Sequence, residues 1–109
     1  MRIEELVKAG KKVPAIGMGC TIHYYSDAEP ATVVRFSKSG KTCWIRQNET
    51  EADPSKGEIC MGHQNWLIKK KFTSSEIRVS LRSDGRWRCS VSDLYVELGR
   101  QYKYYDWEF

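Results

Sequence analysis

Several features that would define a function are missing from this sequence. No stretch approaches the roughly 18 consecutive apolar residues of a membrane-spanning helix, so none of the chain is expected to cross a bilayer. The first residues, Met1–Val7, carry acidic side chains and lack the apolar centre of a secretory signal. No local signature of a catalytic nucleophile or of an acid–base pair occurs. The sequence therefore predicts a cytoplasmic protein that is not an enzyme and has no membrane partner.

The composition is that of one small domain rich in aromatic residues. The chain has 109 residues and a formal net charge of +4. Proline is scarce, at three residues, whereas four tryptophans, six tyrosines and three phenylalanines are present. A small β domain does not easily bury so many rings, so some are expected on the surface. The four cysteines are expected to be free thiols, because a chain that is not exported stays in a reducing compartment.

Two similar glycine turns organise the chain. Lys38–Lys41 and Ser83–Arg86 each contain a glycine and are each flanked by strand-like sequence. They predict two antiparallel hairpins and a mainly β (α+β) domain. We expect a strongly bent antiparallel sheet or a small open SH3-like barrel over residues 17–109, preceded by one short helix over residues 1–12.

The other elements follow from alternation and from turn-forming residues. Turns or loops are expected over residues 26–30 and 49–57, where proline, glycine, serine and acidic residues gather. The expected strands are 20–25, 31–37, 41–47, 59–71, 76–82, 86–91, 94–99 and the aromatic run 102–109.

The register of the second hairpin can be deduced from its two faces. In both strands, apolar residues alternate with arginine and serine. A three-residue loop ending at Gly85 keeps the two faces apart, whereas a two-residue loop would place leucine opposite arginine. The resulting pairs are Leu81 with Trp87, Val79 with Cys89, and Ile77 with Val91. Such a loop ends in a left-handed glycine, so positive φ is expected at Gly85 and, by analogy, at Gly40.

Two short motifs imitate functional sites. Ser39–Thr42 has the end of a phosphate-binding loop, but strand sequence follows it instead of the helix that such a loop requires, so we interpret it as a hairpin. Cys20, His23, Cys60 and His63 together offer four zinc ligands. Residues three apart on a strand point to opposite faces, so we favour buried thiols and ordinary histidines over a zinc site.

Basic residues interleaved with aromatic ones are the remaining candidates for a binding surface. Arginine and lysine attract phosphates and acidic surfaces, and flat rings stack on unpaired bases. The predicted binding residues are Arg78, Arg82, Arg86, Arg88, Lys69, Lys70, Lys71, Trp66, Tyr102 and Tyr104. The simpler interpretation is that Trp87 faces the core and the arginines form a solvated outer face.

Six short motifs follow one another in a recognisable order. They are Gly17–Gly19, Tyr25–Asp27, Pro30–Val34, Ser37–Thr42, Asp84–Trp87 and Tyr104–Phe109. This order resembles a family of small, mostly uncharacterised proteins encoded by bacteriophages and prophages, chiefly of Gram-positive hosts. The motifs are mainly turns and strand ends, so the resemblance implies a shared fold and carries over no catalytic residue.

The resemblance also implies a genomic context. Small accessory phage proteins without an active site act by binding, for example as anti-CRISPR proteins do when they inhibit a host defence component. We therefore expect a counter-defence inhibitor with a host protein as its partner, with no cofactor, acting as a monomer or small homo-oligomer in the host cytoplasm. A module that binds nucleic acid or a signalling nucleotide is the alternative from another class, and a phage structural or assembly component is a third.

Overall fold

The computed structural model describes residues 13–53 and 66–105. Within these residues the chain forms seven β-strands and no helix, so the prediction of a mainly β chain is confirmed. The helix predicted over residues 1–12 lies outside the described residues. The strands are β1 (Gly19–His23), β2 (Ala28–Phe36), β3 (Thr42–Ala52), β4 (Trp66–Phe72), β5 (Ile77–Leu81), β6 (Trp87–Cys89) and β7 (Tyr95–Leu98).

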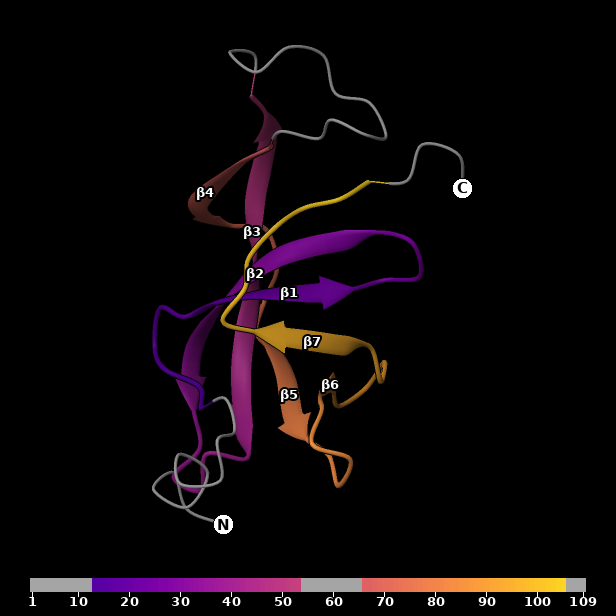
Figure 1. Cartoon of the computed structure of the whole chain (residues 1–109). Helices are drawn as coiled ribbons and strands as arrows, with labels where there is room; N and C mark the ends of the chain where they lie inside the picture. Colours follow the sequence, from indigo (N-terminus) through magenta and orange to yellow (C-terminus); the bar gives the residue numbers. More distant parts are fainter. Residues whose placement is uncertain (1–12, 54–65, 106–109) are drawn as a thin grey trace.

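Six of the strands form a closed barrel (Figure 1). The strand order is β2-β1-β7-β6-β5-β3, all pairs are antiparallel, and β2 also pairs with β3. Neighbouring barrel strands are consecutive along the chain except at two places, where β5 pairs with β3 across β4 and where the first strand, β1, pairs with the last, β7. The expectation of a bent sheet or an open barrel is corrected on this point. The pairing of β1 with β7 closes the ring and gives each barrel strand two neighbours.

Alternate side chains of the barrel strands form the core. Trp87 retains only 5% exposure, which confirms that its ring faces inward. The core comprises Cys20, Ile22, Ala31, Val33, Cys43, Ile45, Val79, Trp87, Cys89, Val96 and Leu98. Its three cysteines are free thiols, as predicted. Burial raises the pKa of Cys20 and of Cys43 to about 12, so both thiols are protonated and unreactive at neutral pH.

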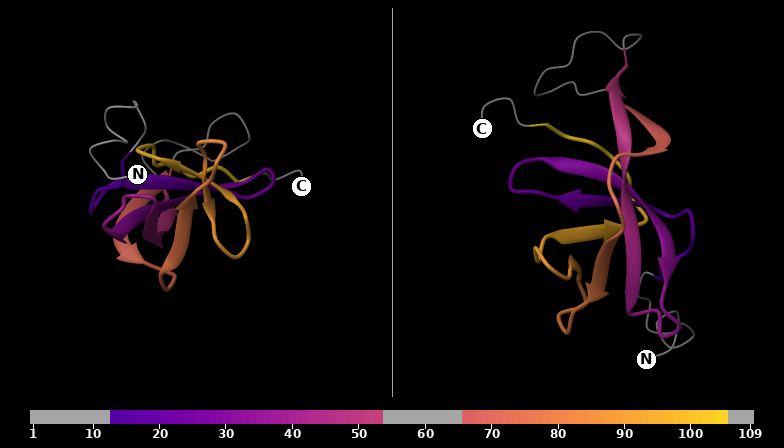
Figure 2. Two further views of the ribbon diagram at one scale, coloured as in Figure 1. Left: turned by 90° about the horizontal axis from the view of Figure 1, so that it is seen from below. Right: turned by 180° about the vertical axis from the view of Figure 1, so that it is seen from behind.

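Strand β3 takes part in both the barrel and a separate two-stranded ribbon. Its first half pairs with β2 and β5 in the barrel, whereas Asn48–Ala52 pairs with β4. Asn48–Ala52 and β4 form a two-stranded ribbon, here called the arm, which rises away from the barrel (Figures 1 and 2). The prediction of a loop over residues 49–57 is therefore wrong for residues 49–52, which belong to β3 because they pair with β4. The strand predicted over 59–71 is present as β4 from Trp66, and residues 59–65 lie outside the described residues.

The two glycine hairpins are present. Gly40 and Gly85 have φ values of 75° and 85°, as predicted, and Ser39–Thr42 leads into β3 as a hairpin turn. In the second hairpin, Leu81 pairs with Trp87 and Val79 pairs with Cys89, which confirms the three-residue loop.

The third predicted pair of the second hairpin is wrong. Strand β6 ends at Cys89, and the chain then turns, so Val91 is fully exposed. Ile77 pairs instead with Ile45 on β3. The turn predicted over 26–30 is also shorter than expected, because Ala28 and the residues after it pair with β1 as the start of β2.

Residues Arg100–Tyr105 run across the outer face of β1 and β2 and are here called the strap. Tyr104 forms an isolated antiparallel bridge with Ala28 through two backbone hydrogen bonds of 2.8 and 2.9 Å. Within the described residues, the strand predicted over 102–109 is reduced to this bridge.

The strap packs closely on the barrel. Thr21, which is wholly buried, donates a hydrogen bond of 2.7 Å from Oγ1 to the carbonyl oxygen of Arg100. The Gln101 Nε2 donates at 2.7 Å to the carbonyl oxygen of Ala31. A Cβ atom at position 19 would lie 2.9 Å from the Cβ atom of Gln101, so this approach requires Gly19.

Candidate functional site

The four arginines predicted around the second hairpin do not form one patch. Arg82 makes an ion pair of 3.3 Å with the carboxylate of Asp93, and Arg88 donates from Nη1 to the Asp93 carbonyl oxygen at 3.0 Å. The side chains of Arg78 and Arg86 make neither a hydrogen bond nor an ion pair in the part of the chain that the structure describes. Arg82 and Arg88 are thus engaged within the chain, whereas Arg78 and Arg86 are available to bind a partner.

The loop between β6 and β7 explains this division. Asp93 has a φ of 61°, in the left-handed region that residues other than glycine adopt at a cost. Its amide donates to the Cys89 carbonyl oxygen at 2.9 Å, and the two arginines hold the rest of the residue. Arg82 and Arg88 therefore stabilise this loop, which leaves less of their charge for a partner.

A second group of arginines surrounds an outward-facing tryptophan. On β3, Trp44 and Arg46 alternate with the buried Cys43 and Ile45, so they lie on the outer face. Trp44 pairs across the sheet with Arg78 on β5. A bulge in β2 between Val33 and Arg35 places Arg35 opposite Trp44 on the other side. Arg35, Trp44, Arg46 and Arg78 are here called the arginine–tryptophan face.

The side chains of this face are held in place by one another. The Arg35 guanidinium lies 3.7 Å from the centroid of the Trp44 ring. Its Nε donates to both carboxylate oxygens of Glu76, at 3.0 and 3.1 Å, which lowers the pKa of that carboxyl. Arg46 lies 4.7 Å from the Phe72 ring and donates to a backbone carbonyl at 2.9 Å. Glu76 accounts for only one of the three arginine charges, so the face stays positive.

Sequence reasoning missed three members of this face. Arg35, Trp44 and Arg46 were not among the predicted binding residues. Trp44 could have been found, since strict alternation along the predicted strand 41–47 places its side chain on the other face of the strand from those of Cys43 and Ile45. Arg35 had no such signal, because a bulge determines the direction in which it points.

The predicted lysines belong to the arm and do not adjoin Arg78. Strand β4 pairs with the far half of β3, whereas Arg78 lies against its first half. Lys69 forms an ion pair of 3.0 Å with Glu51, and Lys70 and Lys71 are exposed. The register shifts at this point, so Lys69–Lys71 oppose a single residue of β3. The lysines thus form a separate basic strip with part of its charge neutralised.

The predicted aromatic residues hold the strap. The Lys103 ammonium lies 5.0 Å from the Trp66 ring and forms an ion pair of 2.6 Å with Glu29. The Arg100 guanidinium lies 4.6 Å from the Tyr102 ring. Tyr104 is half-buried and carries the backbone bridge to β2. These side chains therefore connect the strap to the barrel and to the arm.

Cys20 and His23 do not converge on a common point. Cys20 is buried in the barrel, whereas His23 lies on the outer face of β1, stacked on Tyr95 with ring centroids 5.1 Å apart. The His23 Nε2 lies 3.2 Å from a carboxylate oxygen of Glu97. Cys60 and His63 lie outside the described residues. Among the residues that are described, no three histidine, cysteine or acidic side chains are grouped to hold a metal ion.

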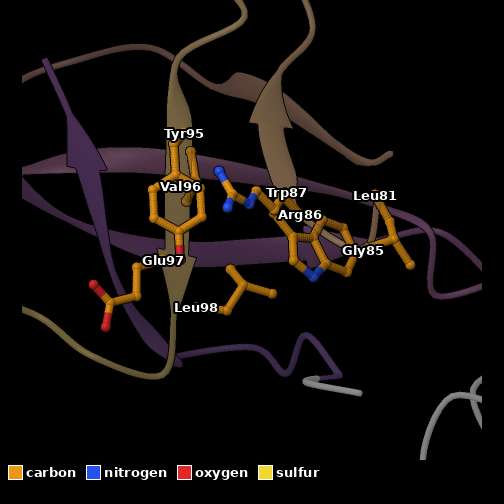
Figure 3. Close-up of a pocket in the computed structure, with 8 residues that line it drawn as sticks. All are labelled: Leu81, Gly85, Arg86, Trp87, Tyr95, Val96, Glu97 and Leu98. Atoms are coloured by element: carbon orange, nitrogen blue, oxygen red, sulfur yellow. The ribbon is translucent and has the colours of Figure 1, made fainter. Parts of the chain in front are cut away.

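A pocket of about 260 Å³, here called the hairpin pocket, opens between the second hairpin and β7 (Figure 3). Figure 3 shows the Trp87 indole and Leu98 at one hollow, with the Arg86 guanidinium beside Tyr95. Its lining consists of Leu81, Gly85, Arg86, Trp87, Tyr95, Val96, Glu97 and Leu98. Arg86, one of the two available predicted arginines, therefore borders an apolar hollow.

Another pocket, of about 440 Å³, lies where the arm meets the barrel. Thr32 Oγ1 donates to Asn48 Oδ1 at 2.8 Å, and Asn48 Nδ2 donates to the Lys69 carbonyl oxygen at 2.8 Å. Gln101 adds a contact of 3.3 Å to the same Asn48 oxygen. These polar groups already bond to one another, so they act as the joint between arm, barrel and strap.

Family models, curated proteins and solved structures yield no match to this chain. The resemblance to phage-encoded proteins therefore stays a prediction. In the described part of the chain, no helix has the length and apolar character needed to cross a membrane.

Proposed function

We propose that this chain is a non-enzymatic phage or prophage accessory protein that inhibits a host defence component by binding it in the host cytoplasm. The observation that carries the proposal is the arginine–tryptophan face, in which Trp44 lies outward on a barrel strand between Arg35 and Arg78. The phage origin is supported by the resemblance of the sequence motifs alone.

The composition of the face suits the centre of a protein interface. Tryptophan and arginine are the residues that most often dominate binding energy, because they bring a large flat surface together with directed charge. Trp44 is half-buried on the outer face and does not contribute to the core, which Ile45 and Val79 fill on the other side of the same strands.

The face is also ordered before any partner arrives. The guanidinium of Arg35 is fixed by Trp44 on one side and by Glu76 on the other. Side chains that are already fixed lose less conformational entropy on binding, so more of the contact energy becomes affinity. Arg78 supplies an exposed charge without an ion-pair partner among the described residues, which favours an acidic surface on the partner.

Affinity capture from a lysate of the bacterial host, with and without nuclease, tests this function. The unchanged chain is compared with Arg78→Glu and with Lys38→Glu, which makes the same change of charge on the first hairpin. We expect one discrete protein to be retained by the unchanged chain and by Lys38→Glu after nuclease treatment, and to be lost with Arg78→Glu. Equal capture by all three chains would show that the face is not the binding surface.

Nucleic acid is the second candidate partner, and the contacts between cations and rings favour it. Besides Arg35 on Trp44, Arg46 lies over Phe72 at the end of β4. Neighbouring cations and rings are the components of a surface for single strands. Binding to an oligonucleotide is then expected to weaken with salt, with a log–log slope of about −0.7 per phosphate contacted for a single strand. A flat response to salt would exclude this function.

A further inference from the structure

The hairpin pocket results from incomplete pairing in the barrel wall. Strand β6 has three residues and pairs with β7 only through Trp87 with Val96 and Arg88 with Tyr95. Beyond the first of these pairs, Gly85 and Arg86 are not paired with β7, and the pocket opens there. The hollow therefore extends from the surface to the edge of the core at this place.

The lining of this pocket combines an apolar floor with a cation at its edge. Trp87, Val96 and Leu98 are core residues, each at most 5% exposed, and they form the floor. Arg86 is exposed and has no ion-pair partner in the described part of the chain. The carboxylate of Glu97, the acid in the lining, is already engaged by His23 at 3.2 Å and by Arg100 at 3.7 Å.

We propose that the hairpin pocket receives one aromatic side chain of the host protein partner, next to an aspartate or glutamate that pairs with Arg86. This inference rests on the proposed function and adds the chemistry of the partner's contact point. The volume of about 260 Å³ lies below the roughly 300–1,000 Å³ of pockets for whole small ligands, so it suits a single large side chain. Anchor residues that fill such pockets are typical of strong protein interfaces.

The position of the pocket fits the same interface as the arginine–tryptophan face. Trp44 pairs with Arg78, and on the next strands Arg88 pairs with Tyr95, which lines the pocket. The outer surfaces of β3, β5, β6 and β7 are therefore continuous from the face to the pocket. One acidic partner surface can contact both, and the aromatic anchor fixes its orientation.

Nuclear magnetic resonance with three short peptides tests the pocket directly. The probes are acetyl-Asp-Phe-Glu-amide, the same peptide with alanine in place of phenylalanine, and the same peptide with lysine in place of both acids. We expect only the first to shift the Trp87 indole N–H signal to saturation, with a Kd of about 1 mM, as for a single anchor contact. The Trp87 signal is assigned by its absence in Trp87→Phe.

The charge contribution is tested with Arg86→Gln, which removes the cation at similar size. Affinity for acetyl-Asp-Phe-Glu-amide is expected to fall about tenfold, as for the loss of a charge-assisted hydrogen bond. Lys38→Gln is the matched control and is expected to leave this affinity unchanged. Failure of the first peptide to saturate, equal shifts with the alanine peptide, or no effect of Arg86→Gln would each overturn the proposal.

The two proposals fail in different ways. If a host protein is captured through Arg78 but the peptides do not bind the hairpin pocket, only the proposal for the pocket is overturned. Peptide binding at the pocket, together with no host protein captured, supports the pocket chemistry and overturns the inhibitor function.

Discussion

The two faces of β3 and β5 differ completely, although their residues alternate along the same strands. Cys43, Ile45 and Val79 are wholly buried and contribute to the barrel core. Their neighbours Trp44 and Arg78 point outward and form a positive, aromatic surface. The inner face therefore stabilises the barrel, and the proposed binding role of the outer face can be tested separately from stability.

Truncation on the inner face is expected to have the largest effect. Ile45→Ala removes a wholly buried side chain and should lower the free energy of unfolding by about 2–5 kcal/mol, because it leaves a cavity in a closed barrel. Trp44→Ala removes a larger side chain, but one that is only half-buried on the outer face, and loses mainly a cation–π contact of about 1 kcal/mol. Urea unfolding of both variants checks the order. Equal losses of stability in Trp44→Ala and Ile45→Ala would contradict the assignment of stability to the inner face.

The next largest effect is expected from alkaline pH, which should lower the free energy of unfolding through the buried thiols of the inner face. The folded pKa of Cys20 and of Cys43 is about 12, above the ordinary value of 9.0, because burial disfavours the thiolate. The unfolded chain therefore loses protons first, and stability that is fully present below pH 9 is lost as pH rises toward 12. The expected loss is about 1.4 kcal/mol per thiol for each pH unit above 9.

The alkaline effect is measured by urea unfolding at pH 8 and pH 10. In the unchanged chain the two thiols together should lower the free energy of unfolding by about 3 kcal/mol between these values. Cys43→Ala removes one buried thiol of raised pKa, so its loss between pH 8 and pH 10 should be smaller by about 1.4 kcal/mol. An identical loss in the variant would show that the thiols do not account for the pH dependence.

The turn that joins β5 to β6 should show a smaller effect. Gly85→Ala places a side chain at a φ of 85°, which costs about 1 kcal/mol. Ser83→Ala, in the same exposed loop, is the control and should change stability little. Thermal unfolding followed by circular dichroism distinguishes the two. Equal thermal unfolding midpoints for Gly85→Ala and Ser83→Ala would contradict the hairpin geometry, which determines which residues of β5 and β6 face inward.

Local features of this fold could be predicted from the sequence, and distant pairings could not. Alternation and turn glycines were sufficient for the second hairpin, including the pairing of Leu81 with Trp87. Closure of the barrel depends on the pairing of β1 with β7, which begin more than 70 residues apart and carry no matching pattern. The arm was missed for the same reason, since β4 extends β3 from a distance.

The candidate site shows the same limit. Arginines could be recognised by type, but their availability depends on tertiary contacts. Asp93 engages Arg82 and Arg88 because the turn after β6 brings its carboxylate and carbonyl to them. Arg35 contacts Trp44 because a β-bulge shifts the register of β2, and the sequence pattern does not predict this bulge.

The affinity of Trp44→Ala for the captured host protein tests the central claim most directly, namely that the outer face of β3 and β5 binds while the inner face stabilises. We predict that the Kd rises by about 30-fold or more, as for the loss of a central anchor, while the variant stays folded by circular dichroism. A Kd equal to that of the unchanged chain in a folded Trp44→Ala would contradict the assignment of the arginine–tryptophan face as the binding surface.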